Sequence, residues 1–241
     1  MRKIYLCICL IAFLPFNIFA DEYTEVASMT KYYKTQTVKD GLSVKEVSYV
    51  EITKSEFDNI KSSEFLSLQS TSNGYVETNY KKLSTSILKN GSKFKYKANL
   101  EWKNIPSVRS YDILAIGFLP NVEVINVEFS QNYCFIDGKC NSSFNYFLNS
   151  DSRGVGAYFS LPSGSLKSLK QTLTLHVKKV NASSTIYKQN VYGDYSHAVK
   201  SIKLTSAKKF TVETNKINLD SSIVNYYDSI DSAKATWNGT W

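Results

Sequence analysis

Arginine and histidine are scarce in this chain of 241 residues, and their scarcity excludes two classes of function. Arg2, Arg109 and Arg153 are the only arginines among 29 basic residues. Because arginine makes the bidentate contacts that read phosphates and bases, we do not expect a nucleic-acid-binding protein. The only histidines, His176 and His197, lie far along the chain from the closely spaced cysteine pair and lack the spacing of a zinc site, so no metal is expected. A glycine-rich phosphate loop is also lacking, and we expect no cofactor.

The sequence has one long apolar run, at its N-terminus, and no other after it. Arg2-Lys3 precedes an almost wholly apolar stretch over residues 4–19, which the small residue Ala20 follows. This arrangement is typical of a secretory signal peptide over residues 1–20 and predicts a secreted, extracellular protein. A membrane anchor is the alternative, but the break at Pro15 and the small residue at the expected cleavage point favour removal. Removal lowers the net charge from +8 to +6, because two cations and no anion are lost.

Cysteine is scarce as well. Cys7 and Cys9 lie in the predicted signal peptide, which leaves Cys134 and Cys140 as the mature pair. An exported pair this close is expected to form a disulfide. The five intervening residues are too many for a thioredoxin-like redox site, and Asp137-Gly138 between them favours a tight turn. We therefore predict a local clamp on a hairpin or loop, which contributes roughly 2 kcal/mol of stability.

Alternation of apolar and polar residues predicts β-strands along most of the chain. In "LSTSILKNGSKFKYKANLEW" (83–102), Asn90-Gly91 separates two alternating runs, which is a strong hairpin signature. A slip of the alternation within residues 122–129 predicts a β-bulge. Further strands are expected at residues 111–118, 154–161, 171–180, 198–205 and 208–214. Many short strands separated by turns predict an all-β fold, either an antiparallel β-sandwich or a jelly-roll-like arrangement.

The residues before 75 are predicted to form a small attached segment. "GLSVKEVSYVEIT" (41–53) is rich in β-branched residues and predicts a strand. Thr53 and Glu56 then form a capping-box pattern that predicts one short helix. A Ser/Thr/Asn-rich stretch over residues 61–74 predicts a linker. After the signal peptide, the expected organisation is a strand–helix segment with its linker over residues 21–74, and a β-sandwich domain with a C-terminal extension over residues 75–241.

The C-terminal extension carries a helical spacing. Asp220 is suited to cap a helix, and Ile223, Tyr227 and Ile230 are spaced four and seven residues apart. The pattern indicates that a short C-terminal helix can form.

Patterns of catalytic residues are nearly absent, since there is no Gly-x-Ser-x-Gly elbow and no paired-histidine zinc helix. The one grouping is "YGDYSHA" (192–198), where Asp194, Ser196 and His197 fall within four residues. Triads normally draw their members from separate segments. We therefore interpret the stretch as a loop turned by Gly193, and keep Asp194 and His197 as weak catalytic candidates.

Aromatic residues gather around the cysteine pair in a stretch otherwise rich in Asn, Ser and Asp. Loops usually lie on the surface, so exposed rings here would suit stacking on sugars or insertion into a bilayer interface. The alternative is that the loop folds back and the rings fill a small core of their own. The candidate ligand-binding residues are Tyr133, Phe135, Phe144, Tyr146 and Phe147.

Three stretches resemble segments of a group of uncharacterised exported β-rich proteins from low-GC Gram-positive bacteria. They are "WKNIPSVRSYDILAIGF" (102–118), "GVGAYFSLPSGSLKSL" (154–169) and "VYGDYSHAVKSIKL" (191–204). The resemblance spans roughly residues 75–215 and includes the pattern Tyr-Gly-x-Tyr-x-His-Ala. It implies a bacterial, secreted origin and brings no known activity.

We predict a secreted, non-enzymatic binding protein that acts at the cell envelope or on an extracellular polysaccharide. The aromatic loop would make the contacts. The lysine-rich surface would attract an anionic cell-wall polymer, a polysaccharide or a lipid surface, or would serve solubility alone. A membrane-active toxin or pore-former is the alternative, because it would use the same charge and the same rings. A secreted hydrolase that uses Asp194 and His197 is the third hypothesis.

Overall fold

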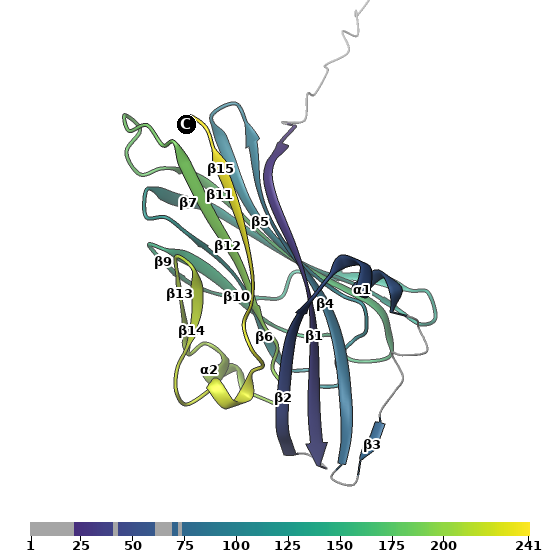
Figure 1. Ribbon diagram of the computed structural model, residues 1–241. Helices are drawn as coiled ribbons and strands as arrows, with labels where there is room; N and C mark the ends of the chain where they lie inside the picture. The colour runs from purple at the N-terminus through teal and green to yellow at the C-terminus, as the bar shows by residue number, and fades with distance from the viewer. Residues whose placement is uncertain (1–21, 41–42, 61–68, 72–73) are drawn as a thin grey trace, which may run out of the picture.

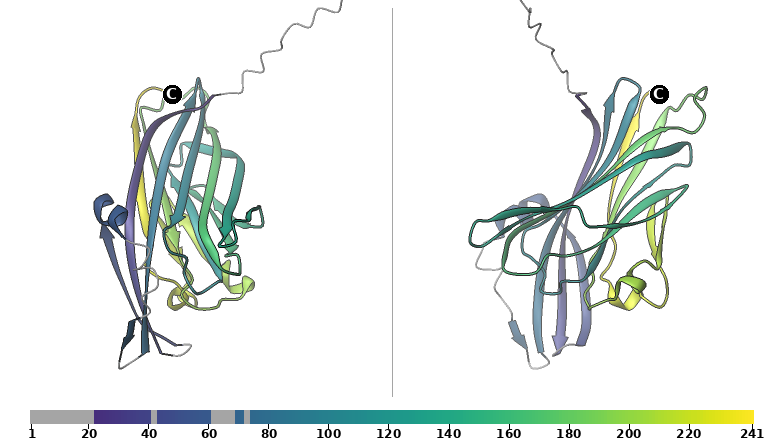
Figure 2. Two further views of the ribbon diagram at one scale, coloured as in Figure 1. Left: turned by 90° about the vertical axis from the view of Figure 1, so that its right-hand side faces the viewer. Right: turned by 180° about the vertical axis from the view of Figure 1, so that it is seen from behind.

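The alternating segments fold into two antiparallel β-sheets that pack face to face (Figures 1 and 2). The computed structural model describes residues 22–40, 43–60, 69–71 and 74–241. The predicted signal peptide and most of the predicted linker lie outside the described residues. The expectation of an all-β fold built as an antiparallel sandwich is confirmed.

The larger sheet has eight strands in the order β2-β1-β4-β5-β11-β7-β8, with β3 paired to β4. Its strands are β1 (Thr24–Asp40), β2 (Ser43–Ile52), β3 (Gln69–Thr71), β4 (Gly74–Asn90), β5 (Lys93–Trp102), β7 (Val122–Phe135), β8 (Cys140–Ser143) and β11 (Leu166–Lys179).

Strand β1 belongs to the same sheet as β4. The two strands pair from Thr24 opposite Lys89 to Lys39 opposite Tyr75. The strand expected at residues 41–53 is present as β2, on the outer side of β1. The predicted division of the chain at residue 74 stays a prediction, although this pairing joins residues from both sides of it.

The smaller sheet has five strands in the order β15-β12-β6-β10-β9. They are β6 (Tyr111–Phe118), β9 (Phe147–Asp151), β10 (Gly154–Ser160), β12 (Lys188–Ser196) and β15 (Asp231–Asn238).

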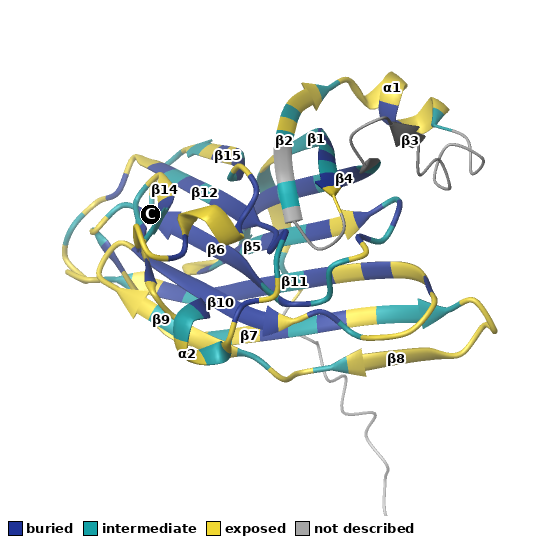
Figure 3. Ribbon diagram, turned by 90° about the horizontal axis from the view of Figure 1, so that it is seen from below, coloured by how far each residue is buried: buried dark blue, intermediate teal, exposed yellow. Residues whose placement is uncertain are grey.

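The main core lies between the two sheets. The alternation predicted for β5 is confirmed, because every second side chain of this strand is buried. These side chains pack with Leu114 and Ile116 of β6 and with Val191 and Tyr195 of β12. Figure 3 shows the buried stretches of the facing strands. The inward residues of β5 are Phe94, Tyr96, Ala98, Leu100 and Trp102.

A second layer covers the outer face of the smaller sheet (Figure 1). It consists of the hairpin of β13 (Phe210–Glu213) and β14 (Lys216–Leu219), the single-turn helix α2 (Leu204–Ala207) and the 3-10 turn η2 (Val224–Tyr226). Glycine is required at position 117 of β6 under the hairpin, since a Cβ atom there would lie 2.4 Å from the carbonyl oxygen of Glu213.

The capping box and the β-bulge are confirmed. Helix α1 (Lys54–Asn59) begins after Thr53, whose Oγ1 accepts a hydrogen bond from the Glu56 N–H at 3.1 Å. In the ladder between β11 and β7, the register passes from His176–Asn126 to Val177–Val124, so that Ile125 is the extra residue of the bulge.

Two sequence predictions about local structure are wrong. The strand expected at residues 198–205 is instead one bridge, from Ala198 to Tyr227, followed by the turn of α2. Ala198 and Ile202 are both buried in the cluster on the outer face of the smaller sheet, so this segment packs against the sheet without joining its ladder.

The "YGDYSHA" stretch is also not a loop, because β12 continues through it to Ser196. Gly193 faces inward at a point where β12 lies very close to β4, since a Cβ atom on Gly193 would lie 2.1 Å from Thr85 Oγ1.

The C-terminal extension forms a single 3-10 turn, η2, and then strand β15, in place of a longer helix. Asp220 does accept a hydrogen bond from the Ser222 N–H at 2.9 Å, but the chain leaves the helical conformation at Tyr227. Pairing of Asp231–Asn238 with β12 explains this, because it completes the ladder at that edge of the smaller sheet.

Candidate functional site

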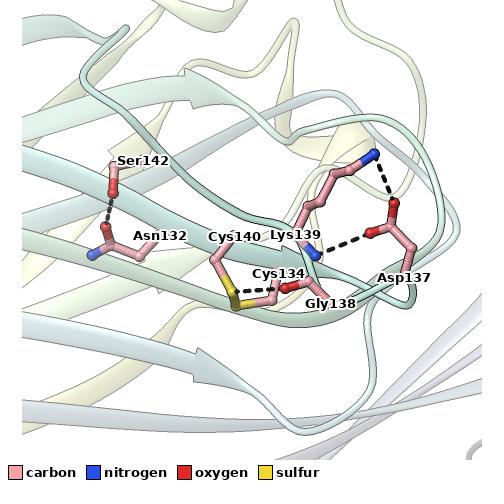
Figure 4. Close-up of a disulfide and its surroundings, with 7 residues drawn as sticks. All are labelled: Asn132, Cys134, Asp137, Gly138, Lys139, Cys140 and Ser142. Carbon is pink, nitrogen blue, oxygen red and sulfur yellow. Dashed lines mark hydrogen bonds and ion pairs between the residues drawn. A yellow bond between two sulfur atoms is a disulfide. The ribbon is translucent and has the colours of Figure 1, made fainter.

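The predicted disulfide between Cys134 and Cys140 is present and joins paired positions of β7 and β8 (Figure 4). The two Cα atoms are 4.0 Å apart. Asp137 Oδ1 accepts a hydrogen bond from the Lys139 N–H at 3.0 Å, and Gly138 takes a φ of 89°, which makes the turn. The bond therefore clamps a short hairpin at one edge of the larger sheet.

The outward side of the larger sheet is polar, and we call it the polar face. Its side chains alternate with the core residues of β4, β5, β11 and β7. Hydrogen bonds cross between strands, as where Thr172 Oγ1 donates to Asn99 Oδ1 at 2.8 Å. The polar face comprises Ser84, Ser86, Lys97, Asn99, Glu101, Glu128, Ser130, Asn132, Lys170, Thr172 and Thr174.

Three neighbouring hollows lie on the polar face. The first, of about 480 Å³, lies over β5, β11 and β7. The second, of about 520 Å³, adjoins the disulfide, and the third, of about 270 Å³, lies over β1, β4 and β5. Glu101 and Lys170 line both the second and the third. The hydrogen bond between Thr172 and Asn99 connects the first with the third. The three hollows are thus neighbours on the polar face.

Two of the predicted aromatic residues lie at the first hollow. The ring of Phe144 is 67% exposed and borders the hollow next to Ser130 and Thr174. Tyr146 lines the same hollow, but it is half-buried because it packs on Phe129, with the ring centroids 5.2 Å apart. Of the two rings at this hollow, Phe144 is therefore the one that is free to contact a ligand.

The other three predicted rings are placed differently. Tyr133 lines the second hollow and packs edge-on against Phe135, with the ring centroids 5.5 Å apart. Phe147 stacks on Tyr158 of the smaller sheet, with the ring centroids 5.3 Å apart, so it does not belong to the polar face. The sequence-based set is therefore divided between the hollows of the polar face and packing positions elsewhere.

The sequence did not lead us to predict the hydroxyl side chains that line the first hollow. Thr172 and Thr174 alternate with Leu173 and Leu175 in "QTLTLHV", so the outward pattern was visible. Only the tertiary structure places Ser130 beside Thr172, through pairing of β7 with β11.

Charges of both signs are mixed on the polar face. Glu101 lies 3.6 Å from Lys82 Nζ, and Glu128 Oε1 lies 2.8 Å from His176 Nε2. Lys97 and Lys170 complete a balanced set, so this surface is not a basic stripe. Such a surface suits a hydroxyl-rich, uncharged ligand better than a strongly anionic one.

The weak catalytic candidates are not brought together. Asp194 is wholly buried near the main chain of Ile217, and this burial raises the pKa of Asp194 to about 7. The ring of His197 packs against Trp102, with the ring centroids 5.2 Å apart, and its Nδ1 lies 3.0 Å from Asp112 Oδ1. Neither candidate lines any of the hollows described above.

A buried ionic cluster connects β4 to the start of β15. Lys81 Nζ lies 2.7 Å from Asp228 Oδ2 and 2.9 Å from Asp231 Oδ2, and all three side chains are at most 1% exposed. Burial works against the charge of Lys81, but attraction to the two aspartates outweighs it and raises the pKa of the ammonium group. Lys81 stands two residues before the buried Leu83 in an alternating strand, which could have identified it as inward-facing.

None of the helices in the described part of the chain is long and apolar enough to cross a bilayer. The same residues contain no group of three or more His, Cys, Asp or Glu side chains placed to hold a metal ion.

Fold and site together define an antiparallel β-sandwich protein with a polar, hollowed outer face. No family model matches the chain, and no curated protein matches it. Seven chains of solved structures do match. One is described as "Pore forming protein"; it shares 10% identity with a TM-score of 0.32, over 66% of this chain and 87% of that one. Similarity this low carries no functional argument, and the resemblance to exported Gram-positive proteins stays a prediction.

Proposed function

We propose that this is a secreted, non-enzymatic binding protein that holds an extracellular polysaccharide on its polar face. One observation carries the proposal. The exposed ring of Phe144 stands beside a hollow that the hydroxyl-bearing residues Ser130, Thr172 and Thr174 line together with apolar side chains. Sugars present an apolar ring face that stacks on aromatic side chains, together with hydroxyl groups that need hydrogen-bonding partners.

The shape of the polar face supports a chain-like ligand. The three neighbouring hollows lie over β1, β4, β5, β11 and β7, and together they cross several strands. The hydroxyl-bearing residues of the site lie on strands β7 and β11, while Phe144 lies in the connection between β8 and β9, next to the hairpin that the disulfide clamps. A site on rigid elements loses little conformational freedom on binding, which favours affinity. The balanced charges of the face favour a neutral polysaccharide.

The test is cosedimentation of residues 21–241, with the disulfide intact, with insoluble cell-wall polysaccharide and, separately, with anionic liposomes loaded with a dye. We expect pelleting with the polysaccharide and no dye leakage. Phe144→Ala should weaken polysaccharide binding about tenfold or more, which corresponds to about 1.4 kcal/mol. The matched control is Tyr187→Ala, because Tyr187 is 70% exposed and does not line the polar face.

Three outcomes would contradict the proposal. Pelleting with liposomes accompanied by dye leakage would replace it with the membrane-active hypothesis. Equal loss of binding in the Phe144 and Tyr187 variants would remove Phe144 from the site. Failure to pellet with any polysaccharide, for a protein whose circular dichroism shows that it is folded, would reject the binding function itself.

A further inference from the structure

A separate cleft lies at the open side of the sandwich, where β7 of the larger sheet faces β9 of the smaller one. Figures 1 and 3 place β7 and β9 along the same side of the molecule. Within the described part of the chain, residues 122–130 of β7 pair only with β11, and β9 pairs only with β10. The two sheets therefore present free edges here, and a cleft of about 790 Å³ lies between them.

The walls of the cleft are aliphatic. Val124 and Val127 come from β7, and Leu148 comes from β9. Ile125 and Val180 stand at the cleft with 59% and 61% of their surface exposed. Covering such side chains is favourable by about 25 cal/mol per Å² of apolar surface, so the cleft gains free energy from an apolar occupant. Its volume falls within the range of small-molecule sites, about 300–1,000 Å³.

The lining chemistry differs from that of the polar face. Phe118 is the one aromatic ring that lines the cleft, and it is 2% exposed, which leaves it unable to stack on a sugar. Aliphatic walls with hydroxyl groups of Ser150 and Ser152 beside them suit a flexible alkyl chain with a polar end. The cleft is thus a second surface, and its assignment does not depend on the proposed polysaccharide site.

The charges at the cleft determine which head group an amphiphilic ligand can carry. Glu123 and Asp151 line the cleft, and none of its lining residues is a lysine or arginine, although the whole chain has a net charge of +8. Lys178 lies 3.3 Å from Glu123 and offsets one of the two carboxylates. Asp151 is left as the dominant charge of the lining residues. A cationic head group complements it, and an anionic one is repelled.

We infer that this cleft binds a soluble single-chain amphiphile, with the alkyl chain between β7 and β9 and a cationic head group beside Asp151. The alkyl chain would contact Val124, Val127 and Leu148, while the ammonium group would remain at the solvent-exposed mouth.

Two probes with the same alkyl chain and opposite heads test the inference: dodecyltrimethylammonium bromide and sodium dodecyl sulfate, both far below their micellar concentrations. Each is titrated into the purified protein and followed by calorimetry and by the methyl NMR signals of valine, leucine and isoleucine. We expect saturable binding of the cationic probe, with shifts at Val124, Val127 and Leu148. Circular dichroism checks that the fold is kept at each addition.

Variants locate the alkyl chain and the head separately. Leu148→Gln should weaken the affinity for the cationic probe about tenfold, because it removes half-exposed apolar surface from the wall of the cleft. Val224→Gln is the matched control, since Val224 is 49% exposed and lies in the 3-10 turn η2, away from the cleft. Asp151→Asn should reduce the preference for the cationic over the anionic probe while leaving the methyl shifts in place.

The inference is overturned if the anionic probe binds as tightly as the cationic one, or if Leu148→Gln and Val224→Gln have equal effects. Methyl shifts spread over the whole surface would indicate adventitious surfactant binding only, which also rejects it. Preferential binding of the alternating peptide acetyl-(Val-Thr)4-amide at the same methyl groups would assign the free edges to strand addition instead.

Discussion

Replacing Lys81 by methionine should destabilise the protein far more than its position on a strand suggests. Its ammonium group is the partner of two carboxylates, at 2.7 Å from Asp228 and 2.9 Å from Asp231, and all three side chains are buried. Methionine fills a similar volume but leaves two uncompensated carboxylates in the interior. Removal of one partner from a buried ion pair costs about 3–5 kcal/mol. This is a large part of the total stability of a typical domain, about 5–15 kcal/mol.

The assay is urea unfolding at pH 7, followed by tryptophan fluorescence. Trp102 is a local reporter, because Lys81 Nζ lies 5.5 Å from the centre of its ring. With an m-value of about 2 kcal/mol/M, a loss of about 4 kcal/mol lowers the midpoint by roughly 2 M. The control is Lys82→Met on the same strand, since Lys82 is 36% exposed and its ion pair with Glu101 is a surface one. Such pairs contribute about 0–1 kcal/mol.

The effect should also depend on pH. Burial already raises the pKa of Asp231 to about 7, and attraction to Lys81 works against this rise. Without Lys81 the pKa of Asp231 in the folded variant is higher still, while the unfolded chain keeps the ordinary value. The variant therefore loses stability as pH rises through the folded value, and Lys81→Met should approach the parent protein below about pH 4. The reasoning is refuted if Lys81→Met and Lys82→Met lie within about 1 kcal/mol of each other at pH 7.

Two further predictions concern β12. The folded pKa of Asp194 is about 7 and its ordinary value is 3.8, so stability should fall as pH rises from 4 to 7. Asp194→Asn, which stays neutral, should therefore stabilise the protein at pH 8 by up to about 4 kcal/mol and have little effect at pH 4; an equal gain in thermal stability at both values would contradict this. Gly193→Ala would place a Cβ atom 2.1 Å from Thr85 Oγ1 and should destabilise by about 1–3 kcal/mol in urea unfolding. An unchanged midpoint would show that the sheets adjust to the extra carbon.

Some features of the fold could be predicted from the sequence because they depend on residues that are close together in the chain. The capping box at Thr53, the turn at Asn90-Gly91 and the clamp of Cys134 to Cys140 each depend on residues within a few positions of one another. The alternation of β5 likewise identified its buried side, since successive side chains on a strand point to opposite faces. The slip that marks Ile125 as a bulge followed from the same period.

The candidate site could be predicted only in part. The aromatic residues near the disulfide were evident, but the sequence could not separate Phe144, which is exposed at the polar face, from Phe147, which stacks on the smaller sheet. Both rings are exposed, and the face on which each one lies depends on which distant strand is beside it. The hydroxyl groups of Ser130 and Thr172, more than 40 residues apart, meet only because β7 and β11 are neighbours.

The sequence by itself determined the all-β class, the strand faces, the short helix and the clamp, because period, capping and cysteine spacing are properties of neighbouring residues. Only the tertiary structure decided the sheet order, the buried cluster of Lys81 with Asp228 and Asp231, and the cleft between β7 and β9. These features arise from pairing and packing between segments far apart in the chain. Their free energies come from burial that no local pattern specifies.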